Sequence, residues 1–97
     1  MINDTSTATP TPTPVPPTLY AVSISTAYGD YISACNGNAN ITAYSTNGGY
    51  PEIGDIYYTD NTGTTTYGTG FYKNSYDAVI ELDSSGVMIG GPNSCDG

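Results

Sequence analysis

The residue types that commonly carry out catalysis are sparse in this chain, which has no histidine and nine aspartates and glutamates. Without histidine, neither a Ser-His-Asp nor a Cys-His arrangement can form, and the commonest general base is missing. Two carboxylates can still act together in a glycosidase. The only sources are Glu52, Asp55, Glu81 and Asp83, and their spacing selects no pair. We therefore expect a protein that is not an enzyme.

Oxygen ligands of the kind that calcium binds occur in two predicted turns, at residues 60–63 and 83–84. Neither turn has the spacing of an EF-hand. Asp and Asn before Gly are also ordinary turn residues, which accounts for both segments without a metal. We expect no metal ligand and no cofactor.

The two cysteines, Cys35 and Cys95, are the remaining reactive side chains. No C-x-x-C spacing supports a redox or zinc site. After the low-complexity start, only about 80 residues remain to form a core, and chains this small usually need a further constraint. A bridge between the two would close a loop of about 60 residues, worth roughly 4 kcal/mol in the chain-entropy model. We predict this disulfide; the alternative is two buried thiols in a reducing compartment.

Tyrosine is the strongest signal in the composition, with ten residues against one phenylalanine and no tryptophan. A tyrosine can pack its ring while its hydroxyl stays in water, so a surface of Tyr, Ser, Gly and Asn can bind sugars or protein neighbours. The loop positions make the best candidates for a binding surface: Tyr50, Tyr67 and Tyr76. The alternative is that tyrosines cover a small core, which we prefer for those in strands: Tyr20, Tyr44, Tyr58 and Tyr72.

The charge of the chain limits the classes of partner that it can bind. The formal net charge is −8 at pH 7, and Lys73 is the single basic residue. The chain cannot neutralise phosphates, which argues against nucleic acid and against anionic membrane surfaces. No apolar run reaches the length of a transmembrane helix. We expect no nucleic-acid partner and no membrane insertion.

Residues 1–18 form a distinct N-terminal segment rich in threonine and proline. Its prolines fix φ and remove backbone donors, which favours polyproline II and a semi-rigid spacer. We predict a stalk or anchor; the alternatives are a disordered tail and an O-glycosylated stem. The start of the chain lacks the features of a signal peptide, which favours a fragment or a virus component released by lysis.

Residues 19–97 have the pattern of an all-β domain: short runs rich in Ile, Val, Thr and Tyr, interrupted by Gly, Asn, Asp and Ser. We predict a small antiparallel sandwich or barrel of about six short strands, at residues 19–27, 41–46, 53–59, 70–73, 78–83 and 87–89. Alternation in the first strand predicts a drier face formed by Tyr20, Val22 and Ile24. Residues 83–86 predict a hairpin turn in which Gly86 adopts the left-handed conformation.

From residue 19 onward, the chain resembles small two-cysteine β-modules that recur in phage tail and fibre proteins and in surface proteins of environmental bacteria, especially Bacteroidota. The resemblance rests on residues 20–22, 34–36, 54–60, 70–72 and 83–87 and on Cys95. It implies a display or assembly module with paired cysteines, and it carries no catalytic residue onto this chain.

These features predict a structural or adhesive subunit of an extracellular assembly, with a bacteriophage virion as the leading candidate. Its partners would be copies of itself or other subunits of a particle or fibre. One alternative is a subunit of a pilus or fibril, in which an extended segment completes a neighbour's sheet. The residues of that assembly segment would be Leu19, Tyr20, Val22 and Ile24. The other alternative is a carbohydrate-binding module whose exposed tyrosines stack on glycans.

Overall fold

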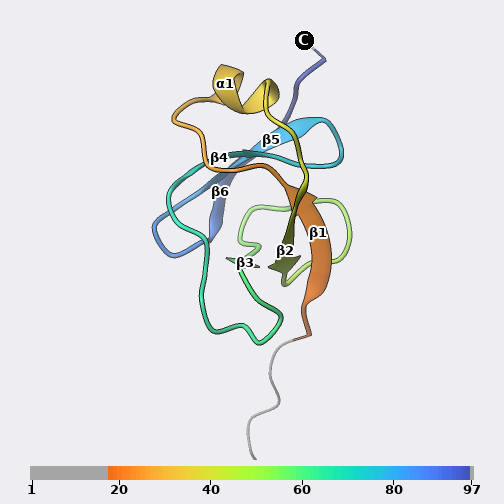
Figure 1. The fold of residues 1–97 in the computed structure, drawn as a ribbon, viewed down its shortest axis with the longest axis vertical. Coiled ribbons are helices and arrows are strands. Elements are labelled where there is room, and N and C mark those ends of the chain that lie inside the picture. Colours follow the sequence, from red (N-terminus) through yellow and green to blue (C-terminus); the bar gives the residue numbers. More distant parts are fainter. Residues whose placement is uncertain (1–17, 97) are drawn as a thin grey trace, which may run out of the picture.

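Two three-stranded antiparallel sheets and a short helix make up the fold in the computed structural model, which describes residues 18–96 (Figure 1). The first sheet has the order β1-β2-β3 and the second has the order β4-β5-β6. This confirms the predicted small antiparallel sandwich. The predicted stalk lies outside the described residues, apart from Thr18.

All the strands are short, and the strands of each sheet follow one another in the sequence. The first sheet contains β1 (Tyr20–Ile24), β2 (Ile41–Ser45) and β3 (Tyr57–Tyr58). The second contains β4 (Gly70–Lys73), β5 (Ala78–Leu82) and β6 (Met88–Ser94). The helix α1 (Tyr31–Cys35) connects β1 to β2 and lies against the second sheet, at the end of the domain opposite the start of β1 (Figure 1).

Backbone hydrogen bonds join the two sheets on both sides. On one side, the chain leaving β1 runs along β4, and the N–H of Ser25 donates to the carbonyl of Lys73 at 2.8 Å. On the other side, the N–H of Tyr57 donates to the carbonyl of Gly86 at 2.9 Å. These contacts bring the sandwich part of the way towards a closed barrel, because paired edges replace open ones.

The core lies between the sheets and draws side chains from both. It consists of Ile24, Ala43, Tyr57, Tyr72, Ile80, Leu82 and Met88. Val22 and Tyr67 are partly buried against it. Val22 and Ile24 therefore form the predicted dry face of β1, while Tyr20, at the start of the strand, is 46% exposed.

The predicted hairpin at residues 83–86 is confirmed. The carboxylate of Asp83 accepts hydrogen bonds from the backbone N–H groups of Ser85 and Val87, at 2.8 and 3.0 Å. Gly86 has a φ of +76°, and a β-carbon there would lie 2.9 Å from the carbonyl oxygen of Tyr57. Only glycine satisfies both the left-handed backbone and this close approach.

The helix α1 is not among the predicted elements. Asp30 caps its N-terminus, since the side chain accepts a hydrogen bond from the N–H of Ser33 at 2.8 Å. A helix of five residues is too short to show a 3.6-residue period, so only the capping residue signals it in the sequence. Its last residue, Cys35, is one of the two cysteines.

The predicted strand at residues 53–59 is wrong in length, because only Tyr57–Tyr58 is regular strand. A turn precedes it: the N–H of Asp55 donates to the carbonyl of Glu52 at 3.1 Å, and Gly54 has a φ of +99°. Three of the large aliphatic residues that the sequence offers for a core are mostly exposed: Ile32 at 69%, Ile53 at 61% and Ile89 at 51%.

Candidate binding cleft

A cleft of about 200 Å³ opens beside the first strand. Its walls are residues 21–24 of β1, the loop at residues 47–51 and the turn at residues 74–76, and Tyr57 also lines it. This volume is below the roughly 300 to 1,000 Å³ of small-molecule pockets. The cleft therefore suits a single ring or a narrow extended chain.

The outer edge of β1 lies in this wall. On one side, β1 pairs with β2 along its whole length. On its other side, the only pairing of β1 within the described residues is the bridge between Ile24 and Asn74. Backbone groups alternate in direction along a strand, and the N–H of Ser25 points away from β2, to Lys73. The N–H and C=O groups of Ala21 and Ser23 point the same way, so backbone donors and acceptors face the cleft along an edge without a partner strand.

Two of the three predicted binding tyrosines meet at the cleft. The rings of Tyr50 and Tyr76 pack edge to face with their centroids 5.0 Å apart, and their exposed fractions are 56% and 53%. Tyr67 lies elsewhere, because it packs against the core and against the ring of Tyr72, at a centroid distance of 5.7 Å. The structure therefore divides the predicted set into a surface pair and a ring that covers the core.

Asn47 fixes the loop that carries Tyr50. Its Nδ2 donates to the carbonyl of Tyr50 at 2.8 Å and to the carboxylate of Asp55 at 3.1 Å. Its Oδ1 accepts a hydrogen bond from the N–H of Gly49 at 2.9 Å. A loop held by side-chain hydrogen bonds in this way loses less entropy when a partner binds.

Gly48 brings the same loop against β1. A β-carbon at Gly48 would lie 2.7 Å from the ring of Tyr20, so glycine allows the ring to pack directly on the loop backbone. Tyr20 therefore belongs to the surface around the cleft, together with Tyr50 and Tyr76. Sequence reasoning placed Tyr20 among the rings that cover the core.

The turn at residues 74–77 contains an unpaired donor. The Oδ1 of Asn74 accepts from the N–H groups of Tyr76 and Ala78, at 2.9 and 3.2 Å, which sets the orientation of the amide. Its Nδ2 is buried and has no hydrogen-bond partner within the described chain, and the residue is only 5% exposed. Such groups are uncommon in folded proteins.

The cleft is uncharged. None of its lining residues carries a formal charge. Burial raises the pKa of Tyr57 to about 12, and the nearby carboxylate of Asp55 contributes to this rise. The phenol of Tyr57 therefore keeps its proton at neutral pH and presents a neutral group to the cleft. An uncharged partner fits this site better than an ion does.

The predicted assembly segment lies in the domain's own sheet. Tyr20, Val22 and Ile24 pair with β2 in register with Ser45, Ala43 and Ile41. Leu19 precedes the strand and is half-buried. Donating this segment to a neighbour would first require its release from β2.

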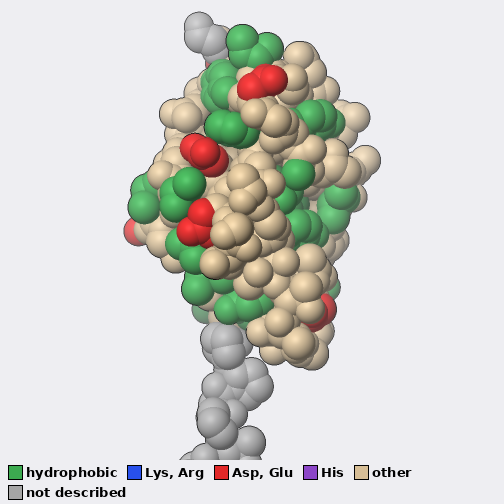
Figure 2. Space-filling model, turned by 90° about the vertical axis from the view of Figure 1, so that its left-hand side faces the viewer, with side chains coloured by type: hydrophobic (Ala, Val, Ile, Leu, Met, Phe, Trp, Pro, Cys, Tyr) green, Lys and Arg blue, Asp and Glu red, His purple; other side chains and the backbone are tan. Residues whose placement is uncertain are grey.

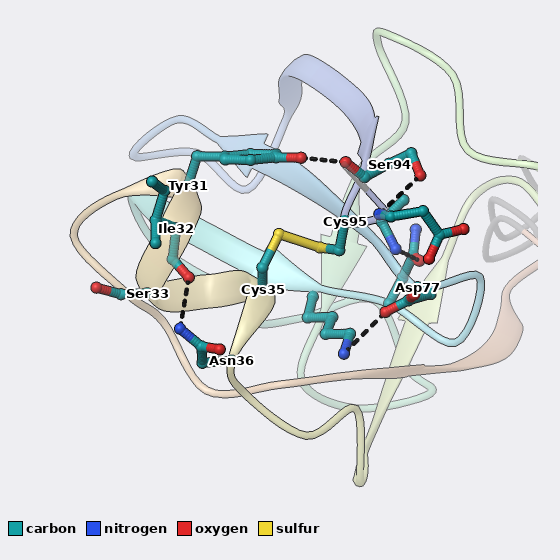
Figure 3. The surroundings of a disulfide bond; sticks show 12 residues. Tyr31, Ile32, Ser33, Cys35, Asn36, Asp77, Ser94 and Cys95 are labelled. Atoms are coloured by element: carbon teal, nitrogen blue, oxygen red, sulfur yellow. Dashed lines mark hydrogen bonds and ion pairs between the residues drawn. A yellow bond between two sulfur atoms is a disulfide. The ribbon is translucent and has the colours of Figure 1, made fainter.

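The predicted disulfide between Cys35 and Cys95 is present, with its Cα atoms 5.6 Å apart (Figure 3). It ties the end of α1 to the chain just after β6. The hydroxyl of Tyr31 donates to the carbonyl of Ser94 beside the bridge. The N–H of Cys95 also donates to the carbonyl of Asp77 at 2.9 Å. This end of the domain is cross-linked and hydrogen-bonded.

Lys73 is engaged by an acidic neighbour, since its Nζ lies 2.9 Å from a carboxylate oxygen of Asp77. The hydrogen bond and positive charge of Lys73 hold the pKa of Asp77 below its usual value. The face drawn in Figure 2 shows scattered acidic side chains among uncharged groups and no basic one. The domain therefore offers no free cationic patch on this face for phosphates.

The carboxylates weighed as calcium ligands serve as turn caps. Asp60 accepts hydrogen bonds from the backbone and hydroxyl of Thr62, and these hydrogen bonds lower its pKa. Asp83 caps the β5–β6 hairpin in the same way. Within residues 18–96, no three acidic or cysteine side chains gather in a group that could hold a metal ion.

No family model, curated protein or solved structure matches this chain. The resemblance to phage and bacterial surface modules is therefore still an expectation, and the functional argument depends on the geometry of the cleft. No helix in the described part of the chain is long and apolar enough to span a membrane.

Proposed function

We propose that this protein is a non-enzymatic structural or adhesive subunit of an extracellular assembly, with a bacteriophage virion as the leading candidate. The observation that carries the proposal is the uncharged, tyrosine-rimmed cleft beside an open strand edge. Open edges invite pairing with another chain, and exposed tyrosines are typical of contact surfaces. Such a surface suits contacts between proteins.

The disulfide supports a location outside the reducing cytosol. Disulfides form and persist in secreted proteins and on virion or cell surfaces. The bridge between Cys35 and Cys95 closes a loop that contains most of the domain. A small module stabilised in this way is compatible with exposure on a particle or a fibre.

The charge distribution supports a protein or glycan partner over a nucleic acid. The net charge is −8 at pH 7, and the only basic residue is engaged by Asp77. Binding to nucleic acid depends on neutralising phosphates with Lys and Arg. This chain has no side chain left for that purpose.

A direct test is to locate the protein. Antibodies against the full chain are applied to purified particles and surface fibres from cultures that produce it, and the sample is imaged by electron microscopy. We expect label at regular positions on virions or on fibres, and the two patterns distinguish the phage from the pilus alternative. Label confined to the cell interior would contradict the proposal.

The second candidate is a carbohydrate-binding module, which the Tyr50–Tyr76 pair favours. Exposed rings can stack on sugars, and the cleft has room for one ring. The test compares a Tyr50→Ala/Tyr76→Ala variant with the wild type on a glycan array. Tyr67→Phe is the matched control, because Tyr67 packs on the core and away from the pair. Glycan binding that survives the double substitution would remove this candidate.

A further inference from the structure

The open edge of β1 presents backbone donors and acceptors to the cleft, because the N–H and C=O groups of Ala21 and Ser23 point to the same side of the strand. Asn74 adds a buried side-chain donor, Nδ2, that has no hydrogen-bond partner within the described chain. A partner with several carbonyl oxygens would complement the donors among these groups. A proline-rich chain keeps a carbonyl at every residue and lacks the N–H only at its prolines.

We propose that the cleft binds residues 10–17 of a second copy of this chain. That segment contains the prolines at positions 10, 12, 14, 16 and 17 and lies outside the described residues. The inference rests on the proposed function as an assembly subunit and names the partner of its cleft. Copies linked in this way form a head-to-tail chain.

The aromatic rim fits this occupant. Proline-rich segments bind in grooves lined by aromatic side chains, where a preformed extended chain loses little entropy. Tyr20, Tyr50 and Tyr76 place three exposed rings around the cleft. The cleft is also small, at about 200 Å³, and a narrow chain enters it more easily than a folded surface does.

The absence of charge in both the N-terminal segment and the cleft also supports this occupant. Residues 5–18 contain no charged side chain, and neither does the lining of the cleft. The rest of each copy is acidic, so copies repel one another at low ionic strength. Docking through an uncharged tail and an uncharged cleft avoids this repulsion at the contact. Added salt should therefore not weaken the association, unlike one held by ion pairs.

The geometry favours a second copy over the chain's own cleft. Only Thr18 and Leu19 separate Pro17 from the start of β1, and β1 itself forms a wall of the cleft. To enter its own cleft, the tail would have to reverse within these two residues, immediately after Pro16 and Pro17. Prolines fix φ and bias the preceding residue towards extended conformations, which opposes so tight a reversal.

Two complementary full-length variants test the proposal. In the first, Gly49→Trp fills the cleft. A β-carbon at Gly49 would make only an ordinary contact, at 3.5 Å from the side-chain oxygen of Asn47, so the fold should tolerate the change. In the second, the five prolines of residues 10–17 are replaced by serine and the cleft is intact. Tyr76→Ala is a second cleft variant, in case Gly49→Trp does not fold.

Light scattering then gives the mass of each protein in solution. We expect the wild type to form species that grow with concentration and each variant alone to have the mass of one chain. An equimolar mixture of the two variants should form a complex of two chains, because one supplies an intact tail and the other an intact cleft. Tyr76→Ala should weaken self-association by about tenfold, as expected for an aromatic contact worth about 1.4 kcal/mol.

Other outcomes overturn the proposal. If the wild type assembles and the mixed variants do not pair, copies associate through another surface, and only the docking inference fails. If the tail perturbs the cleft amides of a wild-type monomer in NMR spectra, the tail binds its own copy, which also overturns it. Antibody labelling of particles tests the proposed function separately, so the failure of the inference and of the function can be told apart.

Discussion

Two regions of the domain differ in how completely their polar groups are satisfied. At the end that carries α1, the disulfide joins Cys35 to Cys95, and Cys95 also donates to Asp77. Around the cleft, β1 has an open edge, Asn74 has an unpaired amide donor and tyrosines are exposed. The first region is fixed covalently, and the second exposes an open strand edge and aromatic rings.

This contrast indicates that one region of the domain stabilises the fold and the other binds a partner. A chain of this size gains stability from its cross-link and can therefore keep an incompletely satisfied surface elsewhere. The turn at residues 74–77 connects the two regions, because Asp77 contacts Lys73 and Cys95 while Tyr76 lines the cleft. Changes at the cross-linked end should affect stability, and changes at the cleft should affect binding.

The largest effect should follow removal of the disulfide. A Cys35→Ser/Cys95→Ser variant should lose about 4 kcal/mol of unfolding free energy, because the bridge closes a long loop. Urea titration followed by circular dichroism measures this loss, with the oxidised wild type as the reference. A loss below about 1 kcal/mol would show that the cross-linked end does not hold the fold.

The next effect tests the floor of the cleft. Ile24 is fully buried and lines the cleft, so Ile24→Ala should cost about 3 kcal/mol through lost burial and a new cavity. Ile32→Ala is the matched control, because Ile32 is 69% exposed and its loss should change stability by about 0.5 kcal/mol or less. Equal losses in thermal denaturation for the two variants would contradict this account of the core.

Alkaline pH should weaken the core through its tyrosines. Burial raises the pKa of Tyr57 from 10.0 to about 12, and burial also raises the pKa values of Tyr67 and Tyr72. The folded state holds these protons more tightly than the unfolded chain, so their contribution is complete below pH 10 and is lost as the pH rises towards 12. Urea midpoints between pH 8 and 12 should show a decline that begins near pH 10. Tyr57→Phe should reduce that decline, and an unchanged decline would rule out Tyr57 as a cause.

The smallest effect on stability should come from the rim of the cleft. Tyr50 and Tyr76 are each more than half exposed, so replacing both by alanine should change the unfolding free energy by about 1 kcal/mol or less. The same variant should lose self-association. Tyr72→Ala is the contrasting control, with an expected loss of about 3 kcal/mol, because that ring is buried. Self-association of this variant at the wild-type level would show that Tyr50 and Tyr76 do not contribute to assembly.

Much of the fold could be predicted from the sequence, because its signals are local. The alternation at residues 20–24 and the Asp83–Gly86 turn have clear chemistry, and the need for a constraint predicted the disulfide. The end of β6 was missed, since Gly90, Gly91 and Pro92 have poor strand propensity and still continue the strand to Ser94. The short helix was missed because it contains a single turn.

The cleft was only partly predictable. Composition and loop position indicated Tyr50 and Tyr76, but the same reasoning included Tyr67, which the structure packs on the core. The unpaired donor of Asn74 and the open edge of β1 depend on which distant segments meet. No local pattern in the sequence contains that information, because both depend on where β1 meets the turn at residues 74–77, at the single bridge between Ile24 and Asn74.

Hydrogen exchange tests the central contrast most directly. Backbone exchange rates are compared between the assembled wild type and the serine variant of residues 10–17, which cannot dock. We expect slower exchange in the assembled protein at the amides of Ala21 and Ser23 and in the loop at residues 47–50, with no change around Cys35 and Cys95. Protection that appears around the disulfide, or none at the β1 edge, would contradict the assignment of the cleft as the binding surface.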